Sequence, residues 1–119
     1  MLRLAIPLLF LGLPVWAADW NLRPGEEPLS LAELDAFEGR TLTFYDDGQS
    51  RYSADGAYSY TYGSGGTAFG TYRIAEDGSI CTAFDHGFNR CDLFVRRDGR
   101  LILIDEKGQR FPVRPEEGS

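Results

Sequence analysis

Two cysteines and the single histidine between them carry the residue types most able to do chemistry in this chain: Cys81, His86 and Cys91. Two thiols can close a disulfide, and two thiols with an imidazole can begin a metal site. A structural zinc site needs further ligands, and the chain has no Cys-x-x-Cys motif and no second histidine. We therefore expect a disulfide between Cys81 and Cys91, formed in an oxidising compartment, and neither a metal nor a cofactor.

His86 follows Asp85, which makes it the one histidine with a neighbouring carboxylate along the chain. A general base also needs a nucleophile and an orienting group within reach. The sequence singles out no serine or threonine for the role of nucleophile. We therefore name no catalytic residue, interpret the histidine as part of a solvated turn, and keep a small hydrolase only as the third hypothesis.

A second group of candidates consists of tyrosines that alternate along one expected strand. Tyr58, Tyr60 and Tyr62 share a face of that strand, and the turn after them sets Tyr60 opposite Phe69. Such a face is either an aromatic platform for a sugar ring, a peptide or an apolar ligand, or ordinary cross-strand packing. The candidate ligand-binding residues are Tyr58, Tyr60, Tyr62 and Phe69, and the same pairing places Tyr72 and Ile74 on the opposite face.

The turn after these tyrosines is rich in glycine and consists of Gly63, Ser64, Gly65 and Gly66. A phosphate-binding loop also needs a lysine and a following helix, and neither is found there. In composition the stretch from Tyr62 to Gly66 resembles the Ser-Gly-rich loop that small exported barrels insert into the cleft of lysozyme to inhibit it. That resemblance implies a loop that contacts a partner protein.

The first residues have the features of an export signal. Arg3 precedes an apolar run from Leu4 to Val15. Val15 and Ala17 then provide the small residues that signal peptidase needs at the third position and the first position before its cleavage site. The run is shorter than the about 20 residues of a membrane-spanning helix. We expect a signal peptide at residues 1–17, cleaved after Ala17, and a periplasmic or secreted domain with no membrane span; an uncleaved anchor is the alternative.

The chain is acidic, with a formal charge of −6. Phosphate backbones and anionic lipid surfaces repel such a chain, which argues against nucleic acid and membrane surfaces as partners. A basic partner would suit the charge, although solubility alone also explains it. The length supports one modest core, so we expect one monomeric domain.

The elements that must position these residues follow from the pattern of turns and apolar residues. Residues 18–29 are polar with two prolines and are expected to be an extended lead-in. Ser30 and Glu33 form a capping box, and Leu31, Leu34 and Phe37 recur on one face, which predicts a helix at 30–38 that docks on the domain. Residues 115–119 are expected to be a disordered tail.

From Arg40 onward the apolar pattern alternates with a period of two, which predicts strands. The expected strands are 41–45, 51–54, 57–62, 67–74, 79–84, 91–96, 100–105 and 109–114. Asp-Gly or Lys-Gly pairs lie between most of them and favour tight hairpins. We predict an all-β antiparallel meander of seven or eight strands within a single domain at 30–114, closed into a small barrel or curled as an open sheet.

The cysteines predict the register of one hairpin. If Cys81 pairs with Cys91, Ala83 faces Asn89 and the turn centres on His86. Closing this loop stabilises the domain by about 2 to 3 kcal/mol. Pro112 lacks a ladder donor and predicts an edge strand, hence incomplete closure, and the apolar run at 101–104 predicts a strand covered on both faces.

The order of motifs also resembles a group of small exported β-proteins of alphaproteobacteria. The matching features are a Leu-Ser-x-x-Glu-Leu helix, the stretch Gly39-Arg40-Thr41-Leu42-Thr43, and Gly70-Thr71-Tyr72-Arg73-Ile74 before Asp77-Gly78-Ser79-Ile80-Cys81. Tyr72 stands where that group carries tryptophan. The group has no assigned activity, so the resemblance implies the fold and an exported location only.

These observations lead to three hypotheses of different classes. The first is a non-enzymatic binding module for an unknown small ligand, with the tyrosine face as its site. The second is an inhibitor or interaction partner of a cell-envelope enzyme, acting through the Gly-rich turn. The third is the small hydrolase, which would need His86 in a cleft beside a carboxylate and a hydroxyl.

Overall fold

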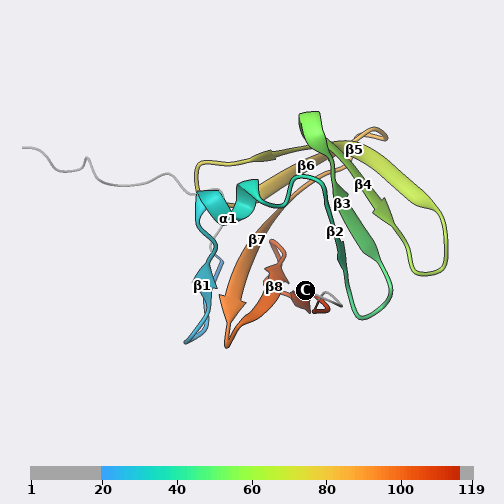
Figure 1. Ribbon diagram of the computed structural model, residues 1–119. Coiled ribbons are helices and arrows are strands. Elements are labelled where there is room, and N and C mark those ends of the chain that lie inside the picture. The colour runs from blue at the N-terminus through green and yellow to red at the C-terminus, as the bar shows by residue number, and fades with distance from the viewer. Residues whose placement is uncertain (1–19, 116–119) are drawn as a thin grey trace, which may run out of the picture.

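The computed structural model describes residues 20–115 and shows one strongly curled antiparallel sheet, a half-barrel (Figure 1). The expected signal peptide and residues 116–119 of the expected tail lie outside the described residues. The strands follow one another as neighbours from β2 to β9, so the predicted all-β meander is confirmed. Their bounds are β2 Arg40–Thr43, β3 Gln49–Tyr52, β4 Ala57–Thr61, β5 Thr67–Ile74, β6 Ile80–Phe84, β7 Asn89–Arg97, β8 Arg100–Ile104 and β9 Arg110–Pro112.

Aspartate–glycine pairs build the tightest turns, as their sequence predicts. Between β7 and β8, Asp98 and Gly99 have φ angles of 51° and 78°, the positive values that a two-residue hairpin needs. Between β3 and β4 the short helical turn η2, Ala54–Gly56, also contains an aspartate with positive φ, Asp55. Because connections of this kind are so short, each strand pairs antiparallel with the strand that follows it in the sequence.

The helix α1, Leu31–Asp35, is shorter than predicted and is capped as predicted. Ser30 accepts a hydrogen bond from the Glu33 amide, and the Glu33 carboxylate accepts one from the Ser30 amide. Leu34 and Phe37 are buried in the core, but Leu31 is 64% exposed, so its expected place on the docked face is wrong. The helix ends at Asp35, before Phe37, so one continuous helical face from Leu31 to Phe37 does not form.

The half-barrel has a core on each side of the strands β7 and β8. The larger core fills the inner, concave side and includes Phe37, Tyr52 and Phe94; the smaller one lies on the outer side. Ile104 belongs to the outer core and Leu103 to the inner one, so β8 is covered on both faces, as predicted. Trp20 packs against the outer core, which places the start of the described chain over that side.

The segment before α1 takes part in the sheet, which the sequence did not indicate. A two-residue strand β1, Glu27–Pro28, pairs with β7, and Figure 1 shows it beside that strand. Glu26 is buried and accepts two hydrogen bonds from the Arg110 guanidinium of β9, at 3.0 and 2.7 Å. The expected lead-in is therefore held to the sheet at two places: β1 pairs with β7, and the Glu26 carboxylate bonds Arg110 of β9.

The two ends of the sheet meet at one point. Phe44, just after β2, forms an isolated bridge with Val113, just after β9, and the Arg114 amide donates to the Thr43 carbonyl at 2.8 Å. No further strand pairing joins β2 to β9 among the described residues. Pro112 lies in the last strand, as expected, and the barrel stays open along the rest of this seam.

The register of two hairpins tests the pairings predicted from the sequence. Cys81 pairs with Cys91 and Ala83 with Asn89, as predicted. The β4–β5 hairpin is shifted by one residue, because Tyr62 belongs to the turn and its amide donates to the Gly66 carbonyl. Tyr60 therefore pairs with Ala68, and the predicted pairing of Tyr60 with Phe69 is wrong.

This one-residue shift exchanges the faces of every side chain on β5. Phe69 points outward and is 59% exposed, while Tyr72 and Ile74 pack against the inner core. The expectation that Tyr72 and Ile74 lie opposite the β4 tyrosines is therefore wrong. They share the inner face with Tyr58 and Tyr60.

Among the described residues, no helix is both long and apolar enough to cross a membrane.

Candidate functional site

The tyrosines of β4 run from the core to the surface along the inner face of the half-barrel. Tyr58 is buried at 8% exposure, Tyr60 is half-buried, and Tyr62 is 53% exposed. The Tyr60 and Tyr62 rings meet edge to face with centroids 5.0 Å apart. The predicted tyrosine face therefore exists, with one end that serves the core and one that meets solvent.

A second aromatic row lies two strands away, on β6 and the turn after it. Phe84 packs edge to face against Tyr58 at 5.8 Å, and the His86 ring stacks on Phe84 at 5.5 Å with an interplanar angle of 2°. Phe88 stacks on Phe84 at 6.2 Å and is 56% exposed. We call the two rows together the aromatic face; its residues are Tyr58, Tyr60, Tyr62, Phe84, His86 and Phe88.

The strand between the two rows, β5, has only small inward residues at this level. Gly70 pairs with both Tyr58 and Phe84, and Ala68 pairs with Tyr60. A Cβ built on Gly70 would collide with the Ala83 carbonyl oxygen, so the curl of the sheet requires glycine there. Because neither residue fills the space above β5, the rings of Tyr58 and Phe84 meet each other directly across that strand.

A charged pair stands on the inner face of β7 beside these rings. The Arg90 guanidinium donates to both carboxylate oxygens of Asp92, with its Nε 3.0 Å from one and its Nη2 2.7 Å from the other. The Arg90 side chain is 38% exposed and that of Asp92 only 11%. Asp92 thus holds the Arg90 guanidinium in a fixed orientation and leaves part of it open to solvent.

Two buried hydroxyls lie beneath this pair. The Ser50 and Tyr58 hydroxyls are hydrogen-bonded at 2.8 Å. Burial raises the pKa of Tyr58 to about 12, although the hydrogen bond to Ser50 acts against the shift. Burial also raises the pKa of Tyr52, with the charges of Tyr58 and Asp92 acting in the same direction. Both phenols are therefore neutral hydroxyls at any physiological pH.

Burial also governs the charged pair. It raises the pKa of the Asp92 carboxyl even though Arg90 lowers it, and the nearby Asp105 and Glu106 add to the rise. Arg90 reaches further across the inner face, since its charge acts on the pKa of both Tyr58 and Tyr60. We treat the aromatic face and the Arg90–Asp92 pair as one candidate site, because Phe88, Arg90 and Asp92 occupy alternate positions on the inner side of the β6–β7 hairpin.

The arrangement suits recognition of a ring that has both an apolar face and polar edges. Aromatic side chains pack against the flat side of such a ring, while a guanidinium and hydroxyls bond its edges. The His86 ring stacks on Phe84 and also on Phe88, which makes it part of the aromatic row. Within residues 20–115 no group of three or more His, Cys, Asp or Glu is placed to hold a metal ion.

The Gly-rich turn stands next to this site. Ser64, Gly65 and Gly66 are exposed, and the two glycines have φ angles of 105° and 89°. A Cβ on Gly63 would collide with the Asp46 carbonyl oxygen of the β2–β3 turn, so the base of the loop rests on its neighbour. The tip is therefore an exposed loop on a fixed base.

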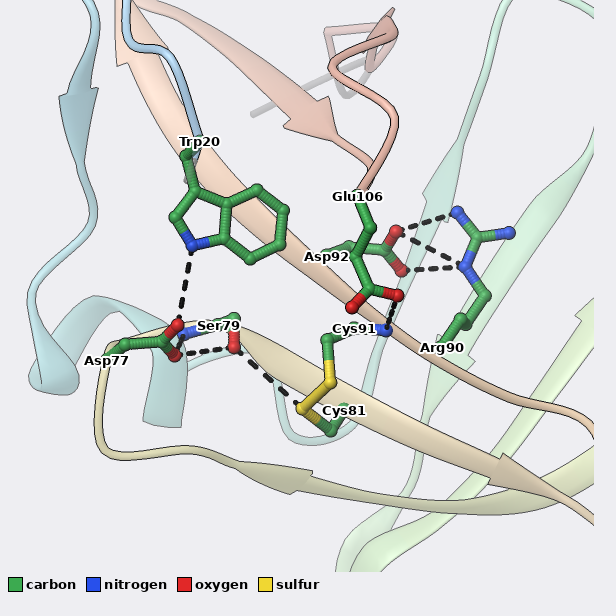
Figure 2. Close-up of a disulfide and its surroundings, with 8 residues drawn as sticks. All are labelled: Trp20, Asp77, Ser79, Cys81, Arg90, Cys91, Asp92 and Glu106. Carbon is green, nitrogen blue, oxygen red and sulfur yellow. Dashed lines mark hydrogen bonds and ion pairs between the residues drawn. A yellow bond between two sulfur atoms is a disulfide. The ribbon is translucent and has the colours of Figure 1, made fainter. Parts of the chain in front are cut away.

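The disulfide lies on the other side of the sheet, with its two cysteines half-buried (Figure 2). Cys91 stands between Arg90 and Asp92 along β7, so its side chain points to the opposite face. Its neighbours are Ser79, whose hydroxyl lies 3.8 Å from the Cys81 sulfur, and Trp20, whose indole N–H donates to Asp77. The predicted disulfide is confirmed, and it fixes the hairpin that carries Arg90.

The structure thus brings together part of the predicted ligand set. Tyr58, Tyr60 and Tyr62 are joined on one face, whereas Phe69 lies on the other. The residues that sequence reasoning did not include are Phe84, His86, Phe88, Arg90 and Asp92. The signal for them was present, because the confirmed Cys81–Cys91 register already pairs Phe84 with Phe88 and sets Arg90 and Asp92 on the same face.

Comparison of the chain with protein-family models, with curated proteins and with solved structures gives no match.

Proposed function

We propose that this chain is a non-enzymatic, exported binding module that takes a sugar ring on its aromatic face. The observation that carries the proposal is the continuity of the aromatic rows. They begin in the core at Tyr58 and end in the exposed rings of Tyr62 and Phe88, beside a guanidinium that Asp92 holds in place. Tyr62 and Phe88 are exposed rings that continue these packed rows, whereas the equally exposed Phe69 stands outside them on the outer face.

Each part of the site has a role in this proposal. The aromatic rings contact the apolar face of a pyranose, and the exposed Tyr62 offers its hydroxyl to the ligand, while the Tyr60 hydroxyl lies against Gly48. Arg90 donates to ring hydroxyls through the N–H groups that Asp92 leaves free. Asp92 is a positioning residue, because it is nearly buried and acts on the ligand through Arg90.

A titration followed by NMR tests the proposal. Maltotriose, cellotriose and chitotriose are added separately to the ¹⁵N-labelled, disulfide-bonded protein, and we expect one of them to shift the amide signals of residues 58–62 and 84–90. Phe88→Ala should weaken that sugar roughly tenfold. Phe69→Ala is the matched control, since its ring is equally exposed on the outer face. Equal losses from both variants, or no shift with any of the sugars, would refute the proposal.

The exported location is a separate part of the proposal. It is supported by the disulfide, which forms readily in oxidising compartments, and by the pattern of residues 1–17. Expression of the full chain in a Gram-negative bacterium, followed by mass spectrometry of the periplasmic fraction, should give a protein that begins at Ala18 and has no free thiol. An uncleaved chain in the cytosolic fraction would contradict export.

An alternative is that the same end of the molecule binds an envelope enzyme as its inhibitor. The exposed tip Ser64–Gly66, seated on its base next to Tyr62, is the observation that favours it. Lysozyme is the direct probe. Inhibition that a Gly65→Val, Gly66→Val variant loses and that Phe88→Ala keeps would support this alternative over the sugar site, because valine is strained at positive φ.

A further inference from the structure

A hollow separate from the aromatic face lies along the open seam of the half-barrel. It is a groove of about 810 Å³ bounded by β2, by the start of β8 and by the helix α1. Figure 1 shows the connection from α1 to β2 running across the top of the half-barrel, with β8 below it. None of the residues of the aromatic face lines this groove.

The groove is basic in a chain that is acidic overall. Its lining includes four arginines, Arg40, Arg96, Arg100 and Arg114, and a single carboxylate, Glu33. The chain as a whole carries a formal charge of −6. A third of its cationic residues therefore line one groove, which makes the groove attractive to anions while the rest of the surface repels them.

Two of the four arginines of the groove are held in exposed ion pairs. Arg96 pairs with Glu33 at 3.2 Å, and both side chains are nearly half exposed. Arg114 pairs with Asp47, which is 68% exposed. Ion pairs this exposed are worth little in water, so an incoming carboxylate can replace either partner at low cost.

The other two arginines add to the positive charge. Arg40 places its guanidinium 5.9 Å from the centre of the Phe37 ring. Among the described residues, no carboxylate forms a salt bridge with Arg100, which lies just after the β7–β8 turn. A ligand that enters the groove therefore meets charge at both of its walls.

One wall of the groove is an open strand edge. β2 pairs with β3 on one side, and on the other side it meets the C-terminal segment only at Phe44 and Thr43. On that second side the stretch from Arg40 to Leu42 pairs with no strand among the described residues, although the Arg40 amide already donates to the Phe37 carbonyl at 2.8 Å. An exposed edge of this kind has backbone groups ready to pair with an extended chain.

We propose that this groove binds an extended acidic segment of a partner protein, added alongside β2 as a further strand. The spacing of the arginines along the groove favours a peptide over a compact anion. Arg40 stands at the α1 end and Arg114 at the Thr43 end, and three steps along a strand separate these ends by about 10 Å. Acidic side chains on alternate residues of an extended chain match such a spread, while backbone bonds to β2 provide the rest.

The proposal is tested with a fluorescent peptide of alternating residues, Glu-Val-Glu-Val-Glu-Val, and the exported, disulfide-bonded protein. Anisotropy should show saturable binding that weakens as salt rises. Arg100→Gln should weaken binding about tenfold, which is the loss of one charge-assisted hydrogen bond. Arg73→Gln, on an exposed outward position of β5, is the matched control and should leave affinity unchanged. Equal affinity of wild type and Arg100→Gln would overturn the proposal.

Two further probes decide between a strand and other occupants. A Glu-Pro-Glu-Pro-Glu-Pro peptide keeps the charge and removes strand donors, so it should bind at least about tenfold more weakly. Equal binding of the two peptides, or full competition by citrate at the same concentration, would show a simple anion site and overturn the strand. A gain in affinity after Glu116→Gln and Glu117→Gln would show that the chain's own acidic end competes, which would also overturn a partner as the resident occupant.

Discussion

Two arginine–carboxylate pairs of similar geometry stand in different regions of this molecule. Glu26–Arg110 joins the segment before β1 to β9, and its carboxylate side chain is 1% exposed. Arg90–Asp92 joins two residues of the same strand, and its guanidinium is 38% exposed. Each arginine donates through two nitrogens, so hydrogen-bond geometry alone does not separate them.

The pKa values of the two carboxylates move in opposite directions. Hydrogen bonds from Arg110 lower the pKa of Glu26 to about 2, despite burial. Burial raises the pKa of Asp92, despite Arg90. The Glu26–Arg110 pair stabilises the folded state when Glu26 is ionised, and it links residues 84 positions apart. The second links neighbours and closes no loop, so we infer that its role is to aim Arg90 at the site.

The largest expected effect is the loss of stability that follows when the Glu26–Arg110 pair is broken. Glu26→Gln leaves Arg110 without its carboxylate in a nearly closed environment, and we expect a loss of about 3 kcal/mol of unfolding free energy. Denaturant unfolding followed by far-UV circular dichroism measures it. Asp92→Asn is the comparison and should cost no more than about 1 kcal/mol, because the partly exposed Arg90 can turn to water and burial already disfavours the Asp92 charge. Equal losses from the two variants would remove the distinction between the pairs.

The pH dependence of stability sharpens the same contrast. Because the folded pKa of Glu26 lies below its ordinary value of 4.5, its contribution is present above pH 4.5 and is lost as pH falls toward about 2. Asp92 acts in the opposite sense, since a raised folded pKa favours folding as pH falls. Glu26→Gln should therefore flatten the acid limb of the stability curve, and Asp92→Asn should leave that limb at least as steep.

The next effect concerns binding. Asp92→Asn keeps the size of the side chain and removes the charge that holds Arg90, so the affinity for the sugar that binds the wild type should fall about tenfold. Calorimetric titration measures it. Glu26→Gln, assayed below its unfolding transition, should bind as the wild type does. A loss in Glu26→Gln that matches the loss in Asp92→Asn would assign both pairs to the fold.

The smallest effect comes from the hydroxyls beneath the site. Tyr58→Phe and Ser50→Ala each remove one side of a buried 2.8 Å hydrogen bond and should each cost about 1 kcal/mol. The double variant should cost less than the sum, because the second change removes a group that the first left unpaired. Thermal unfolding of the four proteins measures the coupling, and simple additivity would show that the two hydroxyls act independently.

The sequence was informative where a feature depends on neighbouring residues. Asp98-Gly99 predicted its hairpin, Ser30 and Glu33 predicted the cap, and the two cysteines predicted a register that the structure confirms. The strand β1 was missed because two residues are too few to show any period. Phe69 was placed on the wrong face because the turn before it takes one more residue than its glycines alone indicate, and one residue reverses a strand.

The candidate site was harder to predict because it depends on several registers at once. Tyr58 meets Phe84 across β5 only when both hairpins are correctly aligned and Gly70 lets the strands approach. The basic groove has no local signal at all. Its arginines come from three separate parts of the chain, namely β2, the β7–β8 hairpin and the segment after β9, and the curl of the sheet brings them to one seam.

The two guanidiniums themselves give the most direct test of the central claim, that Arg90–Asp92 serves a binding site and Glu26–Arg110 serves the fold. Arginine side-chain Nε–H signals are followed by ¹⁵N NMR while maltotriose, cellotriose or chitotriose is added. The account predicts that one of these sugars shifts the Arg90 signal and leaves that of Arg110 in place. An Arg90 signal that none of them moves, or one that moves together with that of Arg110, would contradict it.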